Sequence, residues 1–364
     1  MKKRILALMC TTAVLASAFV ACGSEEEDVT TFAPSTTTEE AATETAPATT
    51  TTNTVAAGEL LTGLGTSVSI ADSKDPADGE DGTAQVDATI AAVTVDSEGK
   101  VVECKIDIAQ TKIGVSANGK ITSDLNAEYP SKRELGDSYG MKKASVIGKE
   151  WYEQADAFAA WTVGKTASEI SGMSIDQGLA GDADLAASVS IHVTGFQSAV
   201  LEAINKAVAG GAAAGDKLGL GLSTNIAKST DASADAEGVA EAYTTISVLT
   251  VNADGVITSS ILDAVQAKVT FDASGVITAD KSVDVPSKNE LGDAYGMKSA
   301  SAIGKEWNEQ AQSYADWTVG HSLSDINGLQ LDEGRVADED LAASVSIHVT
   351  DFNSVISKAI ASAE

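Results

Sequence analysis

The sequence predicts an α+β protein built from two tandem copies of one domain, each an antiparallel sheet packed with helices. The first observation is a repeat: residues 134–164 recur at residues 290–320, 156 positions later and without a gap, with 23 of 31 residues unchanged. Second, alternating apolar residues fill the first half of each copy, which is typical of strands. Third, apolar residues fall at helical spacing in the second half. A repeat this long indicates a duplicated globular domain rather than a solenoid.

The N-terminal residues are typical of a bacterial lipoprotein. Residues 1–21 are predicted to be a signal peptide, because three cations precede an apolar run. The residues from Phe19 to Cys22 resemble a lipobox, which predicts that Cys22 carries a lipid; the alternative is ordinary cleavage that leaves a free cysteine. Residues 22–57 are rich in Thr, Glu, Ala and Pro and contain no Lys or Arg, so a disordered tether is expected. The chain is therefore expected on the extracytoplasmic face of the cell membrane, anchored by lipid.

The net charge of −29 limits the partners of the folded part. Direct binding of nucleic acid or anionic lipid needs Lys and Arg to neutralise phosphate, so no nucleic-acid partner is expected. An internal disulfide is not expected either, because one of the three cysteines lies in the predicted signal and Cys22 is the predicted lipidation site. The remaining Cys104 has Ser260 as its counterpart, which favours a small core residue over a redox thiol.

Copy 1 is assigned to residues 58–208 and copy 2 to residues 218–364, with a Gly/Ala-rich linker at residues 209–217. Each copy is long enough for a hydrophobic core of its own. We therefore expect the copies to fold as independent domains.

Each copy is predicted to begin with strands. The first strand of copy 1 contains Gly63 and Gly65, which indicates that another backbone approaches it closely. After an Asp- and Gly-rich loop, two alternating runs form a predicted hairpin, whose turn contains Gly99 in copy 1 and Gly255 in copy 2. A third strand pair is expected around Gly119 and at the matching position of copy 2.

The second half of each copy is predicted to be helical. The apolar spacing that starts at Trp151, and at the matching tryptophan of copy 2, predicts an amphipathic helix. Short helices should follow at residues 166–169 and 322–325, where a hydroxyl and a carboxylate stand three positions apart as in a capping box. The last helix of copy 1 is predicted to begin at a capping box of Thr194 and Gln197.

Most signatures of enzymes are missing from the sequence. No segment has all the residues of a phosphate-binding loop, and neither copy has the third glycine of a dinucleotide fingerprint. There is no histidine pair at metal spacing and no Gly-x-Ser-x-Gly motif. Four aspartates in residues 72–81 could hold Ca²⁺, but their spacing differs from an EF-hand and favours a solvated acidic loop. No catalytic residue and no metal ligand is assigned.

One segment, SVSIHVT, carries a physical argument for a binding site. It precedes the last predicted helix of each copy, where backbone N–H groups and hydroxyls favour an anion such as phosphate. The alternative is a junction whose hydroxyls only cap the helix and whose histidine is half buried. The candidate cofactor-binding residues are Ser188, Ser190, His192 and Thr194 in copy 1 and Ser344, Ser346, His348 and Thr350 in copy 2.

The order of segments resembles the FMN-binding domain family. The resemblance rests on the hairpin VDATIAAVTVDSEGKVVECKI, the following NGKITSDLNAEY, a Gly-Met-Lys segment with its helix, and SAVLEAINKAV in the last helix. It covers roughly residues 81–208 and 237–362. The family occurs in lipid-anchored envelope proteins and in flavin-carrying subunits of membrane redox pumps, so the resemblance implies FMN as the cofactor.

The resemblance also implies an attachment position. The family has a Ser-Gly-Ala-Thr motif before the last helix, and a separate flavin transferase links its Thr to FMN through a phosphodiester bond. The motif falls on residues 187–190 and 343–346, so Ser190 and Ser346 take the place of the acceptor and still offer a hydroxyl. The glycine and alanine of the motif are replaced by serine and valine, and this departure makes covalent attachment doubtful.

Two functions follow from these observations. The first is flavin-based electron transfer at the cell envelope, with an envelope redox partner or a flavin transferase as partner. The second is a non-catalytic surface binding or structural lipoprotein that keeps the fold without flavin. In either case an electron carrier or binding protein is favoured over an enzyme with its own substrate. Three pairs of aromatic residues could pack on a flavin ring, with core packing as the alternative: Tyr139 and Tyr295, Trp151 and Trp307, and Trp161 and Trp317.

Overall fold

Two antiparallel sheets, one from each copy, carry the fold in the computed structural model, which describes residues 58–363. The predicted signal and the whole of the predicted tether, including Cys22, therefore lie outside the described residues. The first sheet has the order β3-β2-β1-β6, with β1 at Glu59–Ser69, β2 at Gly82–Val95, β3 at Val101–Val115 and β6 at Val208–Ala213. The second has the order β7-β8-β9, with β7 at Lys217–Asn225, β8 at Gly238–Val251 and β9 at Ile257–Phe271.

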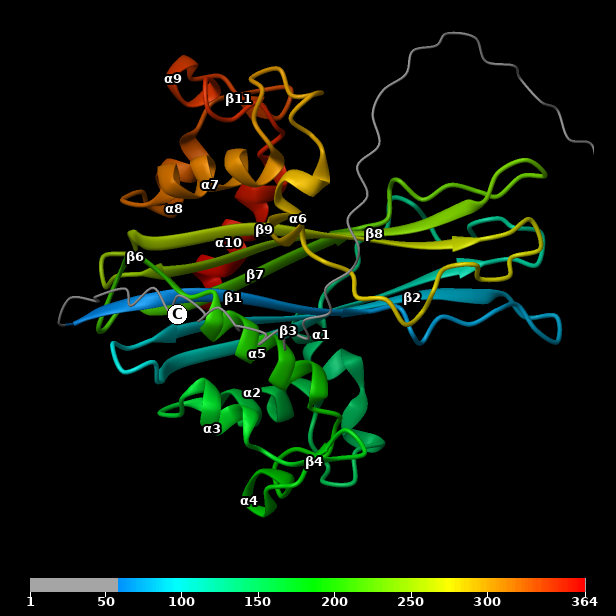
Figure 1. Ribbon diagram of the computed structural model, residues 1–364, viewed down its shortest axis with the longest axis horizontal. Coiled ribbons are helices and arrows are strands. Elements are labelled where there is room, and N and C mark those ends of the chain that lie inside the picture. The colour runs from blue at the N-terminus through cyan, green and yellow to red at the C-terminus, as the bar shows by residue number, and fades with distance from the viewer. Residues whose placement is uncertain (1–57, 364) are drawn as a thin grey trace, which may run out of the picture. The chain divides into compact units, whose positions relative to one another are not determined.

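The helices follow the third strand of each copy and cover the outer face of its sheet (Figure 1). In copy 1 the elements are α1 Lys132–Leu135, η1 Gly136–Tyr139, η2 Met141–Lys143, α2 Trp151–Thr162, α3 Ala167–Ser171, β4 Ile175–Asp176, β5 Leu179–Ala180, α4 Ala183–Ala186 and α5 Thr194–Asn205. In copy 2 they are α6 Lys288–Leu291, η3 Gly292–Tyr295, α7 Trp307–Thr318, α8 Leu323–Gly328, β10 Leu331–Asp332, β11 Arg335–Val336, α9 Glu339–Ala342 and α10 Thr350–Ser362. The prediction of two similar α+β units is confirmed.

The two copies keep the same strand register. Gly82 pairs with Val115 across β2 and β3, and Gly238 pairs with Phe271 across β8 and β9, so both pairs are displaced by the 156 residues of the repeat. The hairpin turns form where Gly99 and its counterpart adopt positive φ, as predicted. The expected third strand pair is reduced to a single bridge in each copy, between Val115 and Ile121 in copy 1.

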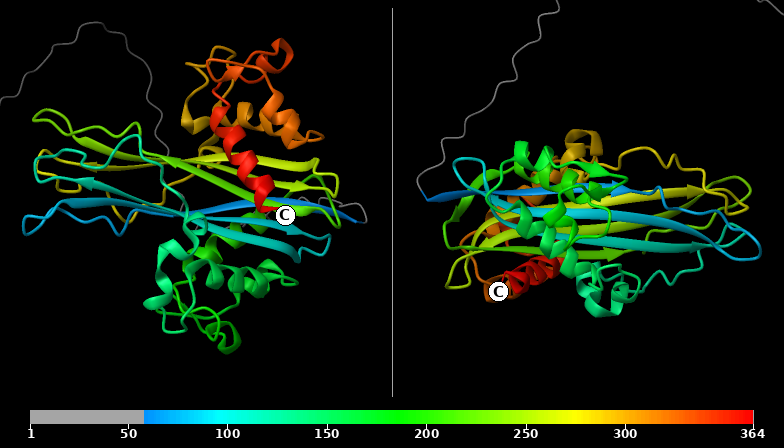
Figure 2. Two further views of the ribbon diagram at one scale, coloured as in Figure 1. Left: turned by 180° about the vertical axis from the view of Figure 1, so that it is seen from behind. Right: turned by 90° about the horizontal axis from the view of Figure 1, so that it is seen from below.

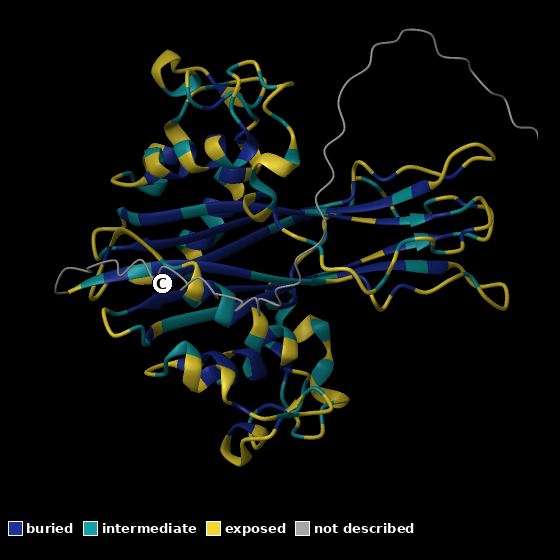
Figure 3. Cartoon of the chain, in the orientation of Figure 1, coloured by how far each residue is buried: buried dark blue, intermediate teal, exposed yellow. Residues whose placement is uncertain are grey.

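The sheets pack face to face, which gives four layers in the order helices, sheet, sheet, helices (Figure 2). Along β2, Ala88 and Ile90 belong to the core between the two sheets, whereas Ala91 and Val93 belong to the core under the helices of copy 1. The dark strands of Figure 3 show that this part of each sheet is buried on both faces. The two copies share this core, because each sheet has a second apolar face that the other sheet covers. Independent folding of each copy stays a prediction.

The segment assigned as a linker contributes to the first sheet. β6 pairs antiparallel with β1, with Thr62 opposite Val208, and so adds a fourth strand to the first sheet. Among the described residues, the sheet of copy 2 has no corresponding strand. Asp216, just after β6, accepts a 2.7 Å hydrogen bond from the Thr258 hydroxyl of β9. The connection between the copies is therefore structured and bonded to both.

The paired glycines let the last helix of each copy lie directly on its first strand. A Cβ atom added at Gly63 would lie 2.0 Å from the Ala203 carbonyl oxygen of α5, and one added at Gly65 would lie 2.0 Å from the Ala199 carbonyl oxygen. In copy 2 the corresponding distances, from Gly219 and Gly221 to carbonyl oxygens of α10, are 2.2 and 2.1 Å. The predicted close approach is confirmed, and the approaching backbone is that of the helix.

Two of the predicted capping boxes are present in the structure, and the one predicted for α5 is not. Thr166 and Ser322 form the expected capping boxes of α3 and α8. The capping box predicted for α5 is wrong: its N-cap residue is Val193, and no side chain caps it. The Gln197 amide instead donates a 2.8 Å hydrogen bond to the Ile170 carbonyl, because α3 packs against this part of α5.

Candidate functional site

The repeated segment 134–164 forms a loop and a helix that two buried side chains hold together. The carboxylate of Glu150, which is 4 % exposed, accepts a 2.8 Å hydrogen bond from the backbone N–H of Met141. The amide of Gln154, which is fully buried, donates to the Ser145 hydroxyl at 3.3 Å. The corresponding side chains of copy 2 are Glu306 and Gln310. Much of the identity between the copies in this segment therefore serves the local structure.

The predicted acceptor serines form hydrogen bonds with the same buried glutamines. The backbone N–H and the hydroxyl of Ser190 donate to the Gln154 side-chain oxygen at 2.8 and 3.2 Å. Ser346 makes the same two bonds to Gln310, at 2.8 and 3.0 Å. Both serines are half buried, and the hydroxyl proton of each is directed to the side chain of a buried glutamine. In this structure the serines join the segment before the last helix to α2 or α7.

The other predicted site residues do not form one cluster with these serines. His192, Thr194, His348 and Thr350 are exposed, and Ser188 and Ser344 are half buried. The N–H group of Val193, one of those expected to bind phosphate, instead donates to the Gly178 carbonyl at 2.8 Å. In copy 2 the N–H of Val349 donates to Gly334 in the same way, at 2.9 Å. Part of the expected anion cradle is thus bonded within the protein.

A cavity of about 250 Å³ lies beside the N-terminal end of α10 in copy 2. Its aromatic walls are Tyr243 of β8, Trp307 of α7 and Phe352 of α10. Among the predicted cofactor-binding residues, His348 lines this cavity, whereas Ser344, Ser346 and Thr350 do not. The polar side chains at its edge include Lys228, which follows β7, and Asp351, in the first turn of α10.

A buried lysine stands behind the aromatic wall of this cavity. Lys288 is 5 % exposed, and its ammonium group donates a 3.0 Å hydrogen bond to the Tyr243 hydroxyl. The ammonium lies 4.6, 4.5 and 4.8 Å from the ring centroids of Tyr243, Tyr295 and Trp307, which are cation–π distances. Burial, together with the positive charge of Lys228, lowers the pKa of Lys288 to about 8. This region of copy 2 therefore contains two lysines, with Asp351 as an acidic neighbour in the cavity lining.

The matching region of copy 1 is acidic and amide-rich. Asp87 occupies the position of Tyr243, and Asp72 that of Lys228, 156 residues earlier. The Asp87 carboxylate accepts hydrogen bonds from the side-chain amides of Gln85 and Gln110 at 2.6 and 2.7 Å. Sequence reasoning missed Tyr243 and Lys228, although the change of charge between copies at both positions was a signal that could have found them.

Trp161, Trp317 and Cys104 are partly buried and pack against the cores under the helices. Trp161 lies 5.7 Å from Phe158, and Trp317 lies 5.4 Å from Tyr314, between ring centroids within one helix. These two tryptophans therefore pack on helical neighbours. Burial raises the pKa of the Cys104 thiol to about 12, which leaves very little thiolate at neutral pH.

The described residues contain no group of three or more His, Cys, Asp or Glu side chains placed to hold a metal ion. Within residues 58–363, no helix has the length and apolar character needed to cross a membrane.

Part of the chain is similar to a redox protein. It is 29 % identical over 126 residues to a chlorophenol reductase from Desulfitobacterium hafniense. The match covers 32 % of this chain and 38 % of that protein, so the chain spans well under half of the relative's length. No family model matches the chain. No solved structure matches it either.

Proposed function

We propose that this chain is an electron-transfer protein of the cell envelope that binds FMN in copy 2 and is held at the membrane by a lipid on Cys22. The observation that carries the proposal is the cavity beside α10, where three aromatic side chains and two lysines come together. The resemblance to the FMN-binding domain family and the partial similarity to a chlorophenol reductase support it. When bound, the flavin would supply the electron-transfer chemistry, and the protein would hold it and tune its potential.

The side chains of the cavity suit the parts of a flavin. Tyr243, Trp307 and Phe352 offer apolar ring faces against which a planar ring system can pack. Lys228 and the ammonium of Lys288 favour negative charge nearby, whether it is on a phosphate or on a ring that has gained electrons. His348 adds a hydrogen-bonding group at the edge. Copy 1 keeps a buried lysine, Lys132, at the position of Lys288, but it has Asp87 in place of Tyr243 and Asp72 in place of Lys228. The proposal therefore assigns one FMN per chain.

The hydrogen bonding of the predicted acceptor serines favours non-covalent binding of FMN. In copy 2 the Ser346 hydroxyl donates to Gln310 and is not part of the cavity lining, so a phosphodiester link there would require this hydrogen bond to break. Ser346→Ala should accordingly leave the flavin content unchanged. A flavin that stays with the protein through denaturation, and that Ser346→Ala removes, would contradict this part of the proposal.

The visible spectrum and the intact mass of protein made with its native secretion apparatus test the proposal. We expect flavin absorption at about one FMN per chain that is lost on denaturation. Tyr243→Asp, which introduces the residue of copy 1, should abolish it. The matched control is Asp87→Asn in copy 1, which should retain it. Colourless protein that also fails to bind added FMN would refute the proposal, and so would equal loss in both variants.

The lipid anchor needs a separate test, because Cys22 lies outside the described residues. Metabolic labelling with a radioactive fatty acid should mark the wild-type chain, and Cys22→Ala should remove the label and release the protein from the membrane fraction. An unlabelled wild-type chain would leave no basis for the anchor.

A second function, a surface binding or structural lipoprotein without flavin, is favoured by two observations. The cavity of about 250 Å³ is smaller than the roughly 300–1,000 Å³ of most ligand pockets. In addition, the acidic Asp351 in the first turn of α10 opposes a phosphate at that helix end. This function predicts colourless protein with an intact fold, which the same spectrum would show.

A further inference from the structure

The two copies meet through an approximate two-fold arrangement, so each half of the interface can be compared with the other. The Ile121 N–H of copy 1 donates to Asp231 of copy 2 at 2.9 Å. The Ile277 N–H of copy 2 donates to Asp75 of copy 1, also at 2.9 Å. Each residue of the second bond is the 156-residue counterpart of one in the first. Side chains displaced by 156 residues therefore occupy equivalent places, as in a homodimer.

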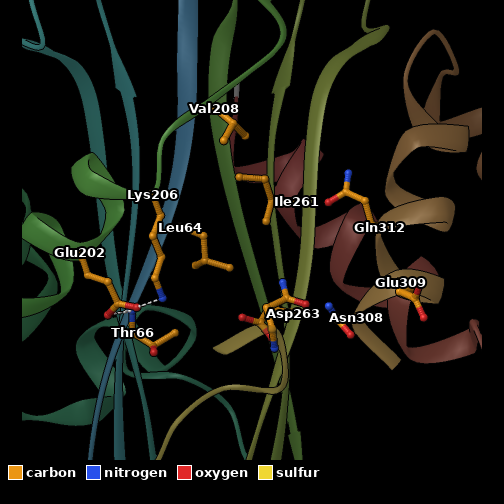
Figure 4. A pocket seen from close by; sticks show the side chains of 11 residues that line it. Leu64, Thr66, Glu202, Lys206, Val208, Ile261, Asp263, Asn308, Glu309 and Gln312 are labelled. Atoms are coloured by element: carbon orange, nitrogen blue, oxygen red, sulfur yellow. Dashed lines mark hydrogen bonds and ion pairs between the residues drawn. The ribbon is translucent and has the colours of Figure 1, made fainter. Parts of the chain in front are cut away.

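One half of this interface contains a cavity of about 450 Å³ (Figure 4). On one side lie Glu202 of α5 and Lys206, which directly follows that helix. On the other side lie Asp263 of β9 and Glu309 of α7. Apolar side chains, including Ile261, form the wall between them. The cavity is thus a mixed site with an apolar wall and several charged groups.

In the other half of the interface, long side chains occupy the equivalent place. Lys105 stands at the position of Ile261, and its ammonium donates to the Ser362 carbonyl at 2.5 Å. Arg133 stands at the position of Asn289, a residue of the cavity lining, and its guanidinium bonds to Asp156 at 2.8 Å. A tyrosine is likewise replaced by an asparagine, at Tyr152 and Asn308. The cavity therefore lies where copy 2 has shorter side chains than copy 1 at three positions.

Acidic side chains outnumber cations in the cavity lining, although the neutral Gln312 stands at the position of Asp156. Asp263 and Glu309 have acidic counterparts in copy 1, and Glu202 replaces Lys358 of the other half. Lys206 is the one cation among the lining residues, and it is already paired with Glu202 and, at 3.0 Å, with Glu290. The cavity wall is consequently left with a surplus of negative charge.

One acceptor of the cavity lining has no hydrogen bond. The side-chain oxygen of Asn308 is buried and accepts no hydrogen bond from any described residue. A buried acceptor without a donor is destabilising, and a turn of the Asn308 amide would bring this oxygen to a donor in the cavity.

We propose that this cavity binds a small organic cation that carries an ammonium or guanidinium group on a short alkyl chain. The alkyl chain would lie along the apolar wall, where the stem of Lys105 lies in the other half. The cationic group would take the place of those of Lys105 and Arg133, in a cavity lined by the carboxylates of Glu202, Asp263 and Glu309. This site is separate from the FMN cavity and does not depend on it.

Agmatine, which has a guanidinium and an ammonium on a four-carbon chain, is the probe, measured by titration calorimetry on the whole mature protein. We expect one site whose affinity falls with added salt. Butylurea, a neutral compound of similar shape, should bind at least about ten-fold more weakly. No heat with agmatine at millimolar concentration, or equal binding of butylurea, would overturn the proposal.

A pair of matched variants places the site. Asn289→Arg introduces the residue of copy 1 and should weaken agmatine binding at least about ten-fold, because its guanidinium fills the cavity. Asn327→Arg adds the same charge at an exposed position of α8 and should leave the affinity unchanged. Thermal unfolding of both variants checks that they fold. Glu202→Gln, a smaller change, should also weaken binding. Wild-type affinity in both Asn289→Arg and Glu202→Gln would refute the location.

Discussion

Gly65→Ala tests whether the close contact between β1 and α5 fixes the position of that helix. The added Cβ would lie 2.0 Å from the Ala199 carbonyl oxygen and 2.5 Å from the Ala203 nitrogen, and both are backbone atoms of the helix. Neither atom can rotate away as the tip of a side chain could. The helix must therefore move off the strand.

The size of that movement sets the expected cost. To restore an ordinary contact of 3.4 Å, α5 must retreat by about 1.4 Å at this point. A gap of 0.5–1 Å already removes about a quarter to a half of the attraction between packed atoms, and Phe196, Val200 and Ala203 all lie on the buried face of α5. Overpacking alone costs about 1–3 kcal/mol, so we expect a loss of unfolding free energy of about 3 kcal/mol or more.

Urea unfolding followed by circular dichroism measures this loss. Gly328→Ala is the matched control, because a Cβ at Gly328 meets nothing within 4 Å and its φ is not positive. The control should change stability by less than about 0.5 kcal/mol. If Gly65→Ala were as stable as Gly328→Ala, the argument that the glycines seat the helix would be wrong.

Three further predictions concern pH, the buried amide and the shared core. Burial raises the pKa of Asp107 from 3.8 to about 6, so the folded chain holds this proton more tightly than the unfolded chain, and stability should fall as pH rises from about 4 to about 6. Asp107→Asn should reduce that fall by about 3 kcal/mol in urea titrations across this range, and an unchanged pH slope would contradict the assignment. Gln154→Met leaves the Ser190 N–H without its acceptor and should cost at least about 2 kcal/mol, whereas Met at the exposed Gln330 should cost little; equal melting temperatures would count against the network. Copy 1 with β6, expressed alone, exposes the sheet face that copy 2 covers and should self-associate in size-exclusion chromatography, so a stable folded monomer would show that the shared core is dispensable.

Local patterns predicted the elements of each copy but not the way the two copies meet. The glycines of β1, the hairpin turn at Gly99 and the helix from Trp151 all follow from spacing within a few residues. The sheet-to-sheet packing had one signal that was not used, since residues 88–95 read ATIAAVTV, and a strand apolar on both faces needs cover on both.

The candidate cavities could not be predicted from local sequence patterns, because they are lined by residues that are far apart in the sequence. Tyr243 and Phe352 are more than a hundred residues apart, and only the packing of α10 on β8 brings them to one cavity. The capping box assigned to Thr194 failed because the Gln197 amide has a better acceptor in a neighbouring helix. The serine motif fell where predicted along the chain, but its hydroxyls turn toward a glutamine that no local pattern marks as a partner.

The covalent connection through β6 has a consequence for how many sites the molecule can carry. In a dimer of identical chains every substitution appears twice, so a change that opens a cavity on one side opens it on the other. Here the two halves are held together within one chain, and each position can change alone. Tyr243 is the counterpart of Asp87 in the other copy, and Ile261 is the counterpart of Lys105. Joined halves also remain together at any dilution, because their association is intramolecular. A symmetric architecture can thus hold one cavity of each kind, with the opposite half keeping the residues that fill it.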